Sequence, residues 1–389
     1  FLYFFVFSIF LLASSCAPKE ELKASKTSDL DSISFYMQEM KNDTLDFETR
    51  LNRANSAFQK IGINKSDSLI KEILTYKIYL FGNLKQYDSA IYISKELLQK
   101  SKKDNDTVSI VKNYSRIAYY SNRNQQKDSA YYYYNLIKNE FIKYNDSIAN
   151  GSNLLEMVEI ERTYGDYTAS EFSASLALTY LKDKNQNLSA KVYNEWGISS
   201  REQGQLKDAI LFYKKAIDLT SLISDKIIFK NNIANAYRDL KEYDKSIAIL
   251  DSLNTIETIE RKTKARIIDN LAYTKWLASK QENVLPELEE AMNIRLQEND
   301  FWGLIASYAH LSTYYENINS KTALSYASKM YNMAIRQNST PDQLEALQKL
   351  IALDNPAKAK QYYGTYLRLN DSLQNSKQIA KNQFAKIKY

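Results

Sequence analysis

Residues 193–216 read YNEWGISSREQGQLKDAILFYKKA and show the repeating unit of this chain in its clearest form. Ala209, Tyr213 and Ala216 follow one another at spacings of four and three residues, which places them on one face of an α-helix. Gly197 lies twelve residues before Ala209, where a compact residue allows a preceding helix to approach closely. The stretch therefore predicts two helices packed as a hairpin.

The same unit returns along the whole chain. Small or short side chains recur at intervals of about 36 to 40 residues, at Ala90, Ala130, Ser170, Ala209, Ser246, Val284, Ala323 and Ala359. An internal repeat of this length indicates an array of helix pairs, in which each pair buries its apolar face against the next. With 8 Gly and 4 Pro in 389 residues, we predict an all-α fold, an α-solenoid without strands.

We call these recurring small residues the anchors of the repeats. Acidic residues stand one or two positions before several of them. They are Asp88, Asp128, Asp208 and Asp244. A carboxylate at the start of a helix can accept hydrogen bonds from the unpaired N–H groups of its first turn. We interpret each Asp as the N-cap of the second helix of its pair.

The arrangement resembles the tetratricopeptide repeat over residues 28–373, most plainly at 193–216. It departs from the family where Tyr114, Leu154 and Tyr193 replace an early Trp, and the closing Pro is missing. The resemblance implies about eight to nine helix pairs that form a right-handed superhelix. It also implies that the first helix of each pair lines a concave groove.

The composition does not favour nucleic acid as the binding partner of this chain. The chain carries 52 Lys and Arg against 46 Asp and Glu, a net charge of +6, and the two signs are interspersed. The 31 Tyr residues suit the interfaces between stacked helices. The run Tyr131-Tyr132-Tyr133-Tyr134 points around the whole circumference of a helix, so it makes a poor platform for stacking bases.

The N-terminus indicates export. Phe1 to Ala13 is an uncharged apolar run, too short to span a bilayer comfortably, and Ser14-Ser15-Cys16 follows it. Residues 1–15 are typical of a secretory signal peptide that lacks its first residues. The segment is similar to a bacterial lipoprotein signal, which implies that Cys16 carries lipid and that the polar residues 16–27 form a tether. The alternative is an ordinary signal peptide with an incidental Cys.

The C-terminus keeps a helical pattern that does not end with a stop signal. Ala380, Phe384 and Ile387 share one face, and residues 374–389 are predicted to begin a long helix that continues further. Its Lys377, Lys381, Lys386 and Lys388 form either a solvated face, which we favour, or the flank of a partner helix. This ending resembles the sensor halves of bacterial membrane regulators, which implies a transmembrane helix and a signalling domain beyond residue 389.

Polar residues at fixed distances before the anchors form the candidate groove. The sets are Arg162, Arg201 and Arg238 at eight residues, Asn194, Asn231 and Asp269 at fifteen, and Glu159, Asn235 and Tyr273 at eleven, with Trp276 beside them. Stacked repeats would bring each set into a row suited to an extended peptide, because amides bond backbone groups and guanidinium groups bond carboxylates. The alternative is that the three Arg residues pair with Glu159, Glu202 and Asp239 as a neutralised surface. Trp276 is either a hydrophobic contact for the ligand or part of the core.

No pattern in the sequence predicts an enzyme. His310 is the single His and Cys16 the single Cys, so disulfides are excluded, and neither a Cys–His pair nor a His pair for a metal exists. We interpret His310 as a hydrogen-bonded core residue rather than a general base. No Gly-rich phosphate loop occurs, and we expect neither a cofactor nor a metal.

The sequence leaves three functions open. The first is a lipid-anchored scaffold of the bacterial cell envelope, at the outer membrane or facing the periplasm, that binds a protein or peptide. The second is the extracytoplasmic ligand-binding half of a membrane-bound sensor. The third is a spacer with an empty groove.

Overall fold

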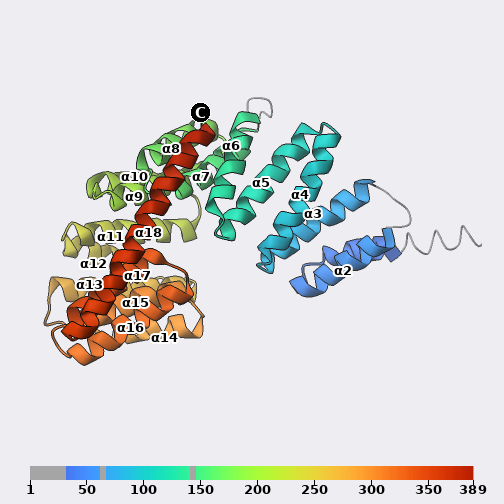
Figure 1. The fold of residues 1–389 in the computed structure, drawn as a ribbon. Helices are drawn as coiled ribbons and strands as arrows, with labels where there is room; N and C mark the ends of the chain where they lie inside the picture. Colours follow the sequence, from blue (N-terminus) through green and yellow to red (C-terminus); the bar gives the residue numbers. More distant parts are fainter. Residues whose placement is uncertain (1–31, 62–66, 141–145, 389) are drawn as a thin grey trace, which may run out of the picture. The chain divides into compact units, whose positions relative to one another are not determined.

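The computed structural model describes residues 32–61, 67–140 and 146–388 (Figure 1). The predicted signal peptide, tether and Cys16 lie outside the described residues. Every regular element in the described part is a helix, which confirms the all-α prediction. No helix among these residues combines the length and the apolar character needed to cross a bilayer.

The chain divides into two compact units, residues 1–125 and 126–389. After a helical segment at residues 32–40, unit 1 contains α2 (Phe47–Ile61), α3 (Asp67–Asn83), α4 (Tyr87–Lys103) and α5 (Thr107–Arg123). Unit 2 contains α6 (Lys127–Glu140), α7 (Ser147–Thr163), α8 (Tyr167–Leu181), α9 (Gln186–Glu202), α10 (Leu206–Leu219), α11 (Ile223–Asp239), α12 (Tyr243–Asn254), α13 (Arg261–Ala278), α14 (Leu285–Gln297), α15 (Phe301–Tyr315), α16 (Ser320–Arg336), α17 (Thr340–Leu353) and α18 (Pro356–Lys388).

Unit 2 is a stack of helix pairs (Figure 1). Each pair joins consecutive helices, from α7 and α8 to α17 and α18, and each pair packs on the next. The predicted contact points lie inside the stack: Ser170, Ala209 and Ala323 are at most 1% exposed. A Cβ on Gly197 would lie 2.5 Å from the Tyr213 ring, so this Gly permits the close approach of α9 and α10.

One predicted contact point is displaced by a helical turn. Val284 is the N-cap of α14, and Leu288 occupies the place inside the pair that the other anchors occupy. The reason is the turn between α13 and α14, residues 279–284, which is longer than the three-residue turns of the preceding pairs.

The prediction that Asp residues cap the second helices is wrong. Asp88, Asp208 and Asp244 lie within the first turns of their helices, one or more residues after the N-cap. There they complement the positive end of the helix dipole without capping it. A residue with positive φ, such as Gly204 (φ 78°) or Lys241 (φ 63°), occupies the middle of each preceding turn and shifts the cap by one or two residues.

The last helix is unusual for its length. α18 runs for 33 residues without a break, so the predicted helix at 374–389 is the second half of a helix that begins at Pro356. Its first half packs on α17 through Tyr362, Tyr366 and Leu369. Its far end reaches α6, the first helix of unit 2, so the two ends of this unit lie side by side (Figure 1).

Candidate ligand-binding face

The ten predicted groove residues all lie on four successive first helices of unit 2. They are Glu159 and Arg162 on α7, Asn194 and Arg201 on α9, Asn231, Asn235 and Arg238 on α11, and Asp269, Tyr273 and Trp276 on α13. The predicted residues are therefore close to one another in the structure. Its side chains differ in what they contact.

Two of the three Arg residues, Arg162 and Arg201, pair with acids on the next first helix, whereas Arg238 lies beside an acid of its own helix. Arg162 lies 2.5 Å from Glu202 and 3.4 Å from Glu195, both on α9. Arg201 lies 2.6 Å from Asp239 on α11, and Arg238 approaches the same carboxylate at 3.7 Å. The ion pairs therefore link α7 to α9 and α9 to α11, and Arg238 reaches α13 by donating to Asn270 at 3.4 Å. This pattern resembles the alternative of a neutralised surface but with other partners: Arg162 pairs with Glu202 and Glu195 rather than with Glu159, and Arg201 pairs with Asp239 rather than with Glu202.

Glu195 is the most perturbed carboxyl of this row. Burial raises its pKa to about 7, and the neighbouring positive charge of Arg162 opposes this shift only in part. Arg162 also faces Glu159 and Glu202, so this corner carries more negative than positive charge. Near neutral pH, a fraction of Glu195 is therefore protonated.

The amides form a second set of links between first helices. Asn232 donates to Asn194 at 2.9 Å, and Asn270 donates to Asn231 at 2.9 Å. Asn231 is 3% exposed, so this contact is internal to the stack. Asn235 differs, since its buried Oδ1 accepts no hydrogen bond from any described residue.

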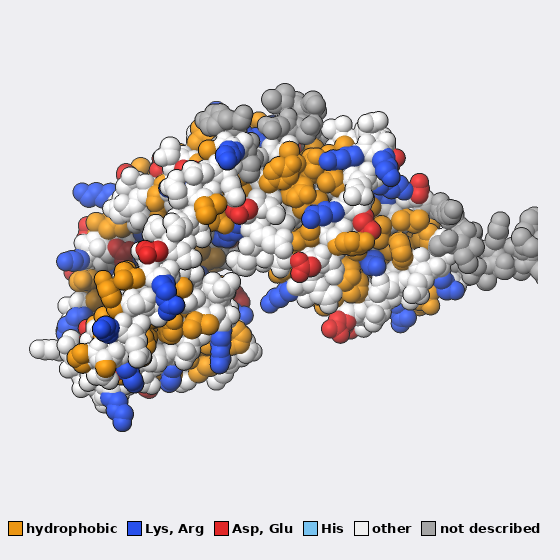
Figure 2. All heavy atoms as spheres, viewed as in Figure 1, with side chains coloured by type: hydrophobic (Ala, Val, Ile, Leu, Met, Phe, Trp, Pro, Cys, Tyr) orange, Lys and Arg blue, Asp and Glu red, His pale blue; other side chains and the backbone are white. Residues whose placement is uncertain are grey.

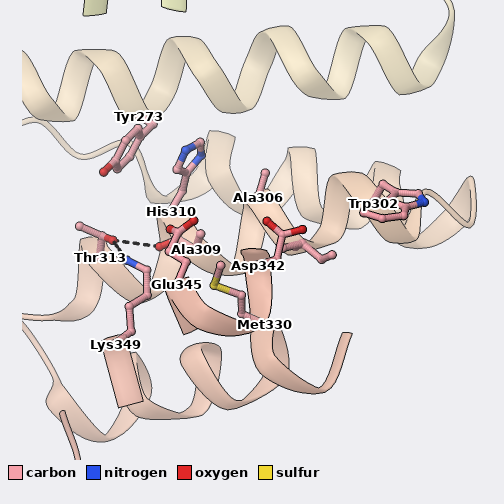
Figure 3. A pocket seen from close by; sticks show the side chains of 11 residues that line it. Tyr273, Trp302, Ala306, Ala309, His310, Thr313, Met330, Asp342, Glu345 and Lys349 are labelled. Atoms are coloured by element: carbon pink, nitrogen blue, oxygen red, sulfur yellow. Dashed lines mark hydrogen bonds between the residues drawn. The ribbon is translucent and has the colours of Figure 1, made fainter. Parts of the chain in front are cut away.

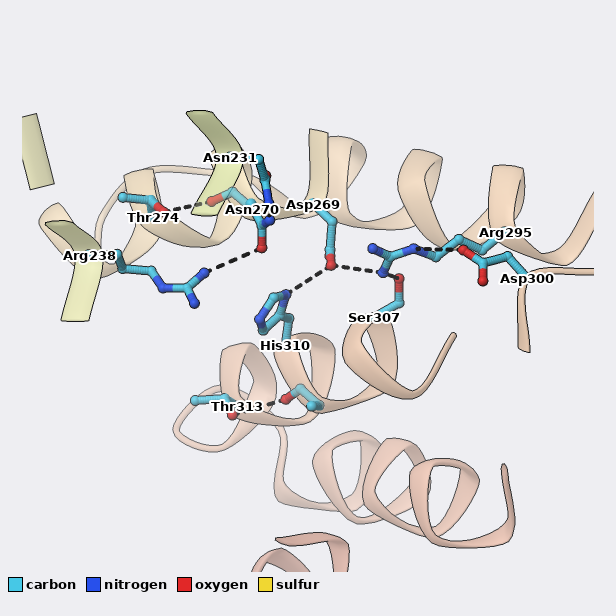
Figure 4. Close-up of polar contacts among 11 residues, drawn as sticks. Asn231, Arg238, Asp269, Asn270, Thr274, Arg295, Asp300, Ser307, His310 and Thr313 are labelled. Atoms are coloured by element: carbon cyan, nitrogen blue, oxygen red, sulfur yellow. Dashed lines mark hydrogen bonds and ion pairs between the residues drawn. The ribbon is translucent and has the colours of Figure 1, made fainter. Parts of the chain in front are cut away.

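Asp269 is the centre of a buried polar cluster (Figure 4). Its Oδ2 lies 2.8 Å from Arg295 on α14 and 3.0 Å from Nδ1 of His310 on α15. Burial alone would raise the pKa of Asp269, but the charges and hydrogen bonds of His310 and Arg295 outweigh it and hold the pKa at about 2. Asp269 is 1% exposed, so it supports the site from within and cannot reach a ligand.

His310 is hydrogen-bonded and packed, as the sequence predicts. Besides its contact with Asp269, its ring stacks on Tyr273 with 3.9 Å between the centroids. Trp276 is a core residue: it is 6% exposed and packs with Val284, Leu288 and Leu311. Tyr273 and His310, in contrast, border open space.

A cavity of about 320 Å³ lies between the first helices α13, α15 and α17 (Figure 3). Its lining combines aromatic, apolar and charged side chains, among them Tyr273, Trp302, His310, Met330, Asp342, Glu345 and Lys349. Trp302 is 56% exposed at the rim. A second cavity of about 250 Å³ adjoins it, because Thr313, Glu345 and Lys349 border both.

The charged groups of this cavity are less engaged than those of the Arg row. Lys349 donates to Thr313 Oγ1 at 2.7 Å, and Asp342 accepts from Ser339 at 2.5 Å. Neither Glu345 nor Lys349 forms an ion pair with another described residue. Its volume is at the lower end of the range of ligand sites, and its lining mixes polar with apolar side chains. Within the described chain, no group of side chains is arranged to hold a metal ion.

The sequence pattern identified one wall of this cavity and missed the rest. Tyr273 belongs to the predicted set, whereas Trp302, Asp342, Glu345 and Lys349 do not. The turns within the last three pairs, residues 279–284, 316–319 and 354–355, differ in length, so fixed distances from the anchors lose register there. Lys349 on α17 is the tenth residue of its helix, as His310 is on α15, and this correspondence could have revealed it.

Comparison with known proteins supports the fold. No family model matches the chain, and no curated protein sequence matches it. Among solved structures, the apo form of RapI has a TM-score of 0.61 at 11% identity, over 92% of this chain and 99% of RapI. The apo form of the quorum sensor NprR from B. thuringiensis has a TM-score of 0.58 at 12% identity, over 90% and 99%.

A third structure names the repeat. It is a signal-transduction ATPase of the STAND class from Pyrococcus horikoshii, with a tetratricopeptide repeat sensor, at a TM-score of 0.54 and 14% identity. The match covers 93% of this chain and 55% of the ATPase. The fold is that of tetratricopeptide-repeat proteins. At these identities the likeness establishes the fold alone.

Proposed function

We propose that this chain is a non-enzymatic scaffold that binds a protein or peptide segment along the first helices of unit 2. The observation that carries the proposal is the cavity between α13, α15 and α17. It lies on the helix face that the repeat resemblance assigns to ligands. Its Glu345 and Lys349 form no ion pair within the described chain.

The lining indicates the chemistry of the bound segment. Tyr273, Trp302 and Met330 offer contact area for an apolar or aromatic side chain, while Glu345 and Lys349 can hold polar groups of opposite sign. Each charge-assisted hydrogen bond that becomes desolvated would add about 1.5–3 kcal/mol to binding.

The similar structures favour a sensing role within this class. One is a quorum sensor, and another carries a tetratricopeptide repeat sensor. We therefore retain the sensor as the second candidate: an extracytoplasmic ligand-binding half of a signalling protein, followed by a transmembrane helix after residue 389. Sequencing the gene past Tyr389 tests it, since the sensor requires an apolar span of about 20 residues.

The proposed location is the bacterial cell envelope. Its support is the sequence alone: the apolar run Phe1 to Ala13 and the lone Cys16 after it. Expression of Cys16→Ser beside the native chain in the source bacterium, with a labelled fatty acid, tests the anchor. We expect the native chain to carry label and sediment with membranes, and the variant to lack label. Equal labelling would remove the lipid anchor and leave the cavity proposal intact.

Selection of peptides tests the binding proposal. A library of random twelve-residue peptides is panned on the intact chain, and the enriched peptides are titrated by calorimetry against Trp302→Ala and Tyr92→Ala. Both side chains are aromatic and more than half exposed, at 56% and 62%, so neither change disturbs the core. We expect roughly tenfold weaker binding to Trp302→Ala and no change for Tyr92→Ala. Enriched peptides that bind both variants as tightly as the native chain would reject the cavity as the site.

A further inference from the structure

The far end of α18 contains a buried aromatic residue on an otherwise exposed stretch. Phe384 is 1% exposed and Ala380 is 2% exposed, whereas Ile379 on the opposite side of the same helix is 56% exposed. Residues 374–388, which we name the latch segment, therefore contact the rest of unit 2 through one narrow stripe. The proposed ligand cavity does not use this stripe.

The partner of Phe384 is a pair of Tyr rings, Tyr131 on α6 and Tyr164 at the end of α7. The Phe384 ring stacks on Tyr131 with 3.7 Å between centroids, and Tyr164 meets it edge-on at 5.3 Å. Tyr131 donates to the buried Glu161 at 2.8 Å, which holds its ring in place. We name these two rings the aromatic seat. The edge-on contact with Tyr164 is a preferred geometry of aromatic pairs.

Charged side chains of both signs surround the aromatic seat, with Lys138 on the seat side beside Asp166 and Lys381. Lys377 and Lys381 are half-buried, and Lys377 passes beside Gly165 in the turn after α7. On the seat side lie Glu161, Asp166 and Asp128; burial and the carboxylate of Asp128 raise the pKa of Tyr164 to about 12. The Lys stripe is therefore only partly the solvated face that the sequence favoured, since Lys386 alone is described as exposed.

The contact is local, unlike the packing within the helix pairs. A cavity of about 510 Å³ remains beside it, bordered by Lys138 on α6, Asp166, Ala169 and Phe172 around α8, and Lys381 on α18. The buried contacts of the latch segment are thus one aromatic side chain, Phe384, and one small side chain, Ala380.

We infer that the aromatic seat is a binding site for a basic amphipathic helix bearing one aromatic residue, and that the latch segment occupies it as a detachable intrachain ligand. When it is docked, α18 joins the last helix pair of unit 2 to α6, the first helix of that unit. When it is released, the aromatic seat can bind another basic amphipathic helix that bears one aromatic residue. This inference is independent of the proposed ligand cavity, and its test uses no ligand of that cavity.

Two variants of the intact chain form the test, Phe384→Ala and its control Ile379→Ala. Both remove an apolar side chain from the same helix, one docked and one exposed. We expect amide hydrogen exchange in residues 127–140 and 374–386 to quicken roughly tenfold in Phe384→Ala and to stay within about twofold in Ile379→Ala. Exchange in α6 that is unchanged by Phe384→Ala would overturn the docked latch.

A peptide supplied in trans then tests the seat itself. A fluorescein-labelled peptide of residues 374–389 should bind Phe384→Ala roughly tenfold more tightly than the native chain, in which the seat is occupied. Equal affinity for both, or no binding to either, would overturn the proposal. Concentration-dependent dimers of the native chain would also overturn it, since a second copy would then fill the seat.

A second variant, which changes charge rather than the buried ring, serves if Phe384→Ala does not fold. If Phe384→Ala has reduced helicity, the double variant Lys377→Glu with Lys381→Glu replaces it, because both side chains keep solvent contact. It should also quicken exchange in α6 and bind the labelled peptide more tightly than the native chain. Native-like exchange and native-like peptide affinity in this variant would contradict the inference.

Discussion

The middle of unit 2 and its last three helix pairs use the same helix face in different ways. On α7, α9 and α11, Arg162 and Arg201 bond acids of the next first helix. On α15 and α17, Trp302, Glu345 and Lys349 surround a cavity instead. Turns of three residues keep the first region in register, whereas unequal turns displace the helices of the second. Turns of equal length thus allow polar side chains of neighbouring first helices to bond one another. Turns of unequal length leave a cavity between the helices in which a ligand can bind.

The largest expected effect concerns the cluster beneath the cavity. Asp269→Ala leaves Arg295, 3% exposed, with only the more distant carboxylate of Asp300 at 4.0 Å, and removing one partner of a buried pair costs about 3–5 kcal/mol. The control Glu345→Ala removes an exposed carboxylate with no ion pair and should change the free energy of unfolding by less than about 0.5 kcal/mol. Urea unfolding measures both. Similar losses would show that the cavity wall is structural.

The second effect concerns pH and the Arg row. The pKa of Glu195 is raised from 4.5 to about 7, so the unfolded chain ionises first as pH rises. The folded state therefore loses stability between pH 4.5 and 7, by up to about 3 kcal/mol, and less because the side chain is 21% exposed. Relative to Glu195→Gln, the native chain should weaken across this window. Parallel stability curves for the two chains would contradict the assignment.

The third effect concerns the turns that keep the row in register. Lys241 and Gly204 occupy the same place in successive turns with φ of 63° and 78°. Lys241→Gly should stabilise the fold by up to about 1 kcal/mol, and Gly204→Ala should destabilise it by a similar amount. No atom would crowd a Cβ at Gly204, so the difference reports backbone conformation alone. Thermal unfolding with opposite shifts confirms this, and shifts of the same sign argue against it.

The smallest effect is expected for the exposed part of the row. Arg201 and Asp239 are 35% and 30% exposed, so their pair should contribute about 0–1 kcal/mol. Arg201→Ala should therefore unfold at nearly the native urea concentration, and the difference should shrink further at high salt. A loss above about 2 kcal/mol would mean that the row is a buried network.

On the face drawn in Figure 2, positive and negative side chains are interspersed rather than gathered into one field. This matches the sequence pattern of 52 basic and 46 acidic residues. Such a surface gives little long-range attraction to a polyanion. Recognition by this chain should depend on short-range contacts like those at Trp302 and Glu345.

The fold could be predicted because its signal is periodic. Ser170, Ala209 and Ala323 are small where helices cross, and a helix face repeats with every turn regardless of what surrounds it. The repeat spacing gave the wrong contact residue at Val284, because one longer turn moved the contact to Leu288. Local periodicity carries no information about turn length.

The candidate site could be predicted only in part, for a different reason. The sequence placed Arg162, Arg201 and Arg238 on one face, but which acid pairs with each depends on distances between helices. Trp302 and Lys349 were not predicted because the turns within the last three pairs differ in length, so fixed distances from the anchors lose register there. The docking of Phe384 on Tyr131 joins residues far apart in sequence, at opposite ends of unit 2.

Calorimetric titration of one selected peptide against Trp302→Ala and Arg201→Ala tests the contrast between the two regions most directly. We predict roughly tenfold weaker binding to Trp302→Ala and, because Arg201 is already paired with Asp239, a change within about twofold for Arg201→Ala. The reverse order of affinities would contradict the account and assign the ligand to the Arg row.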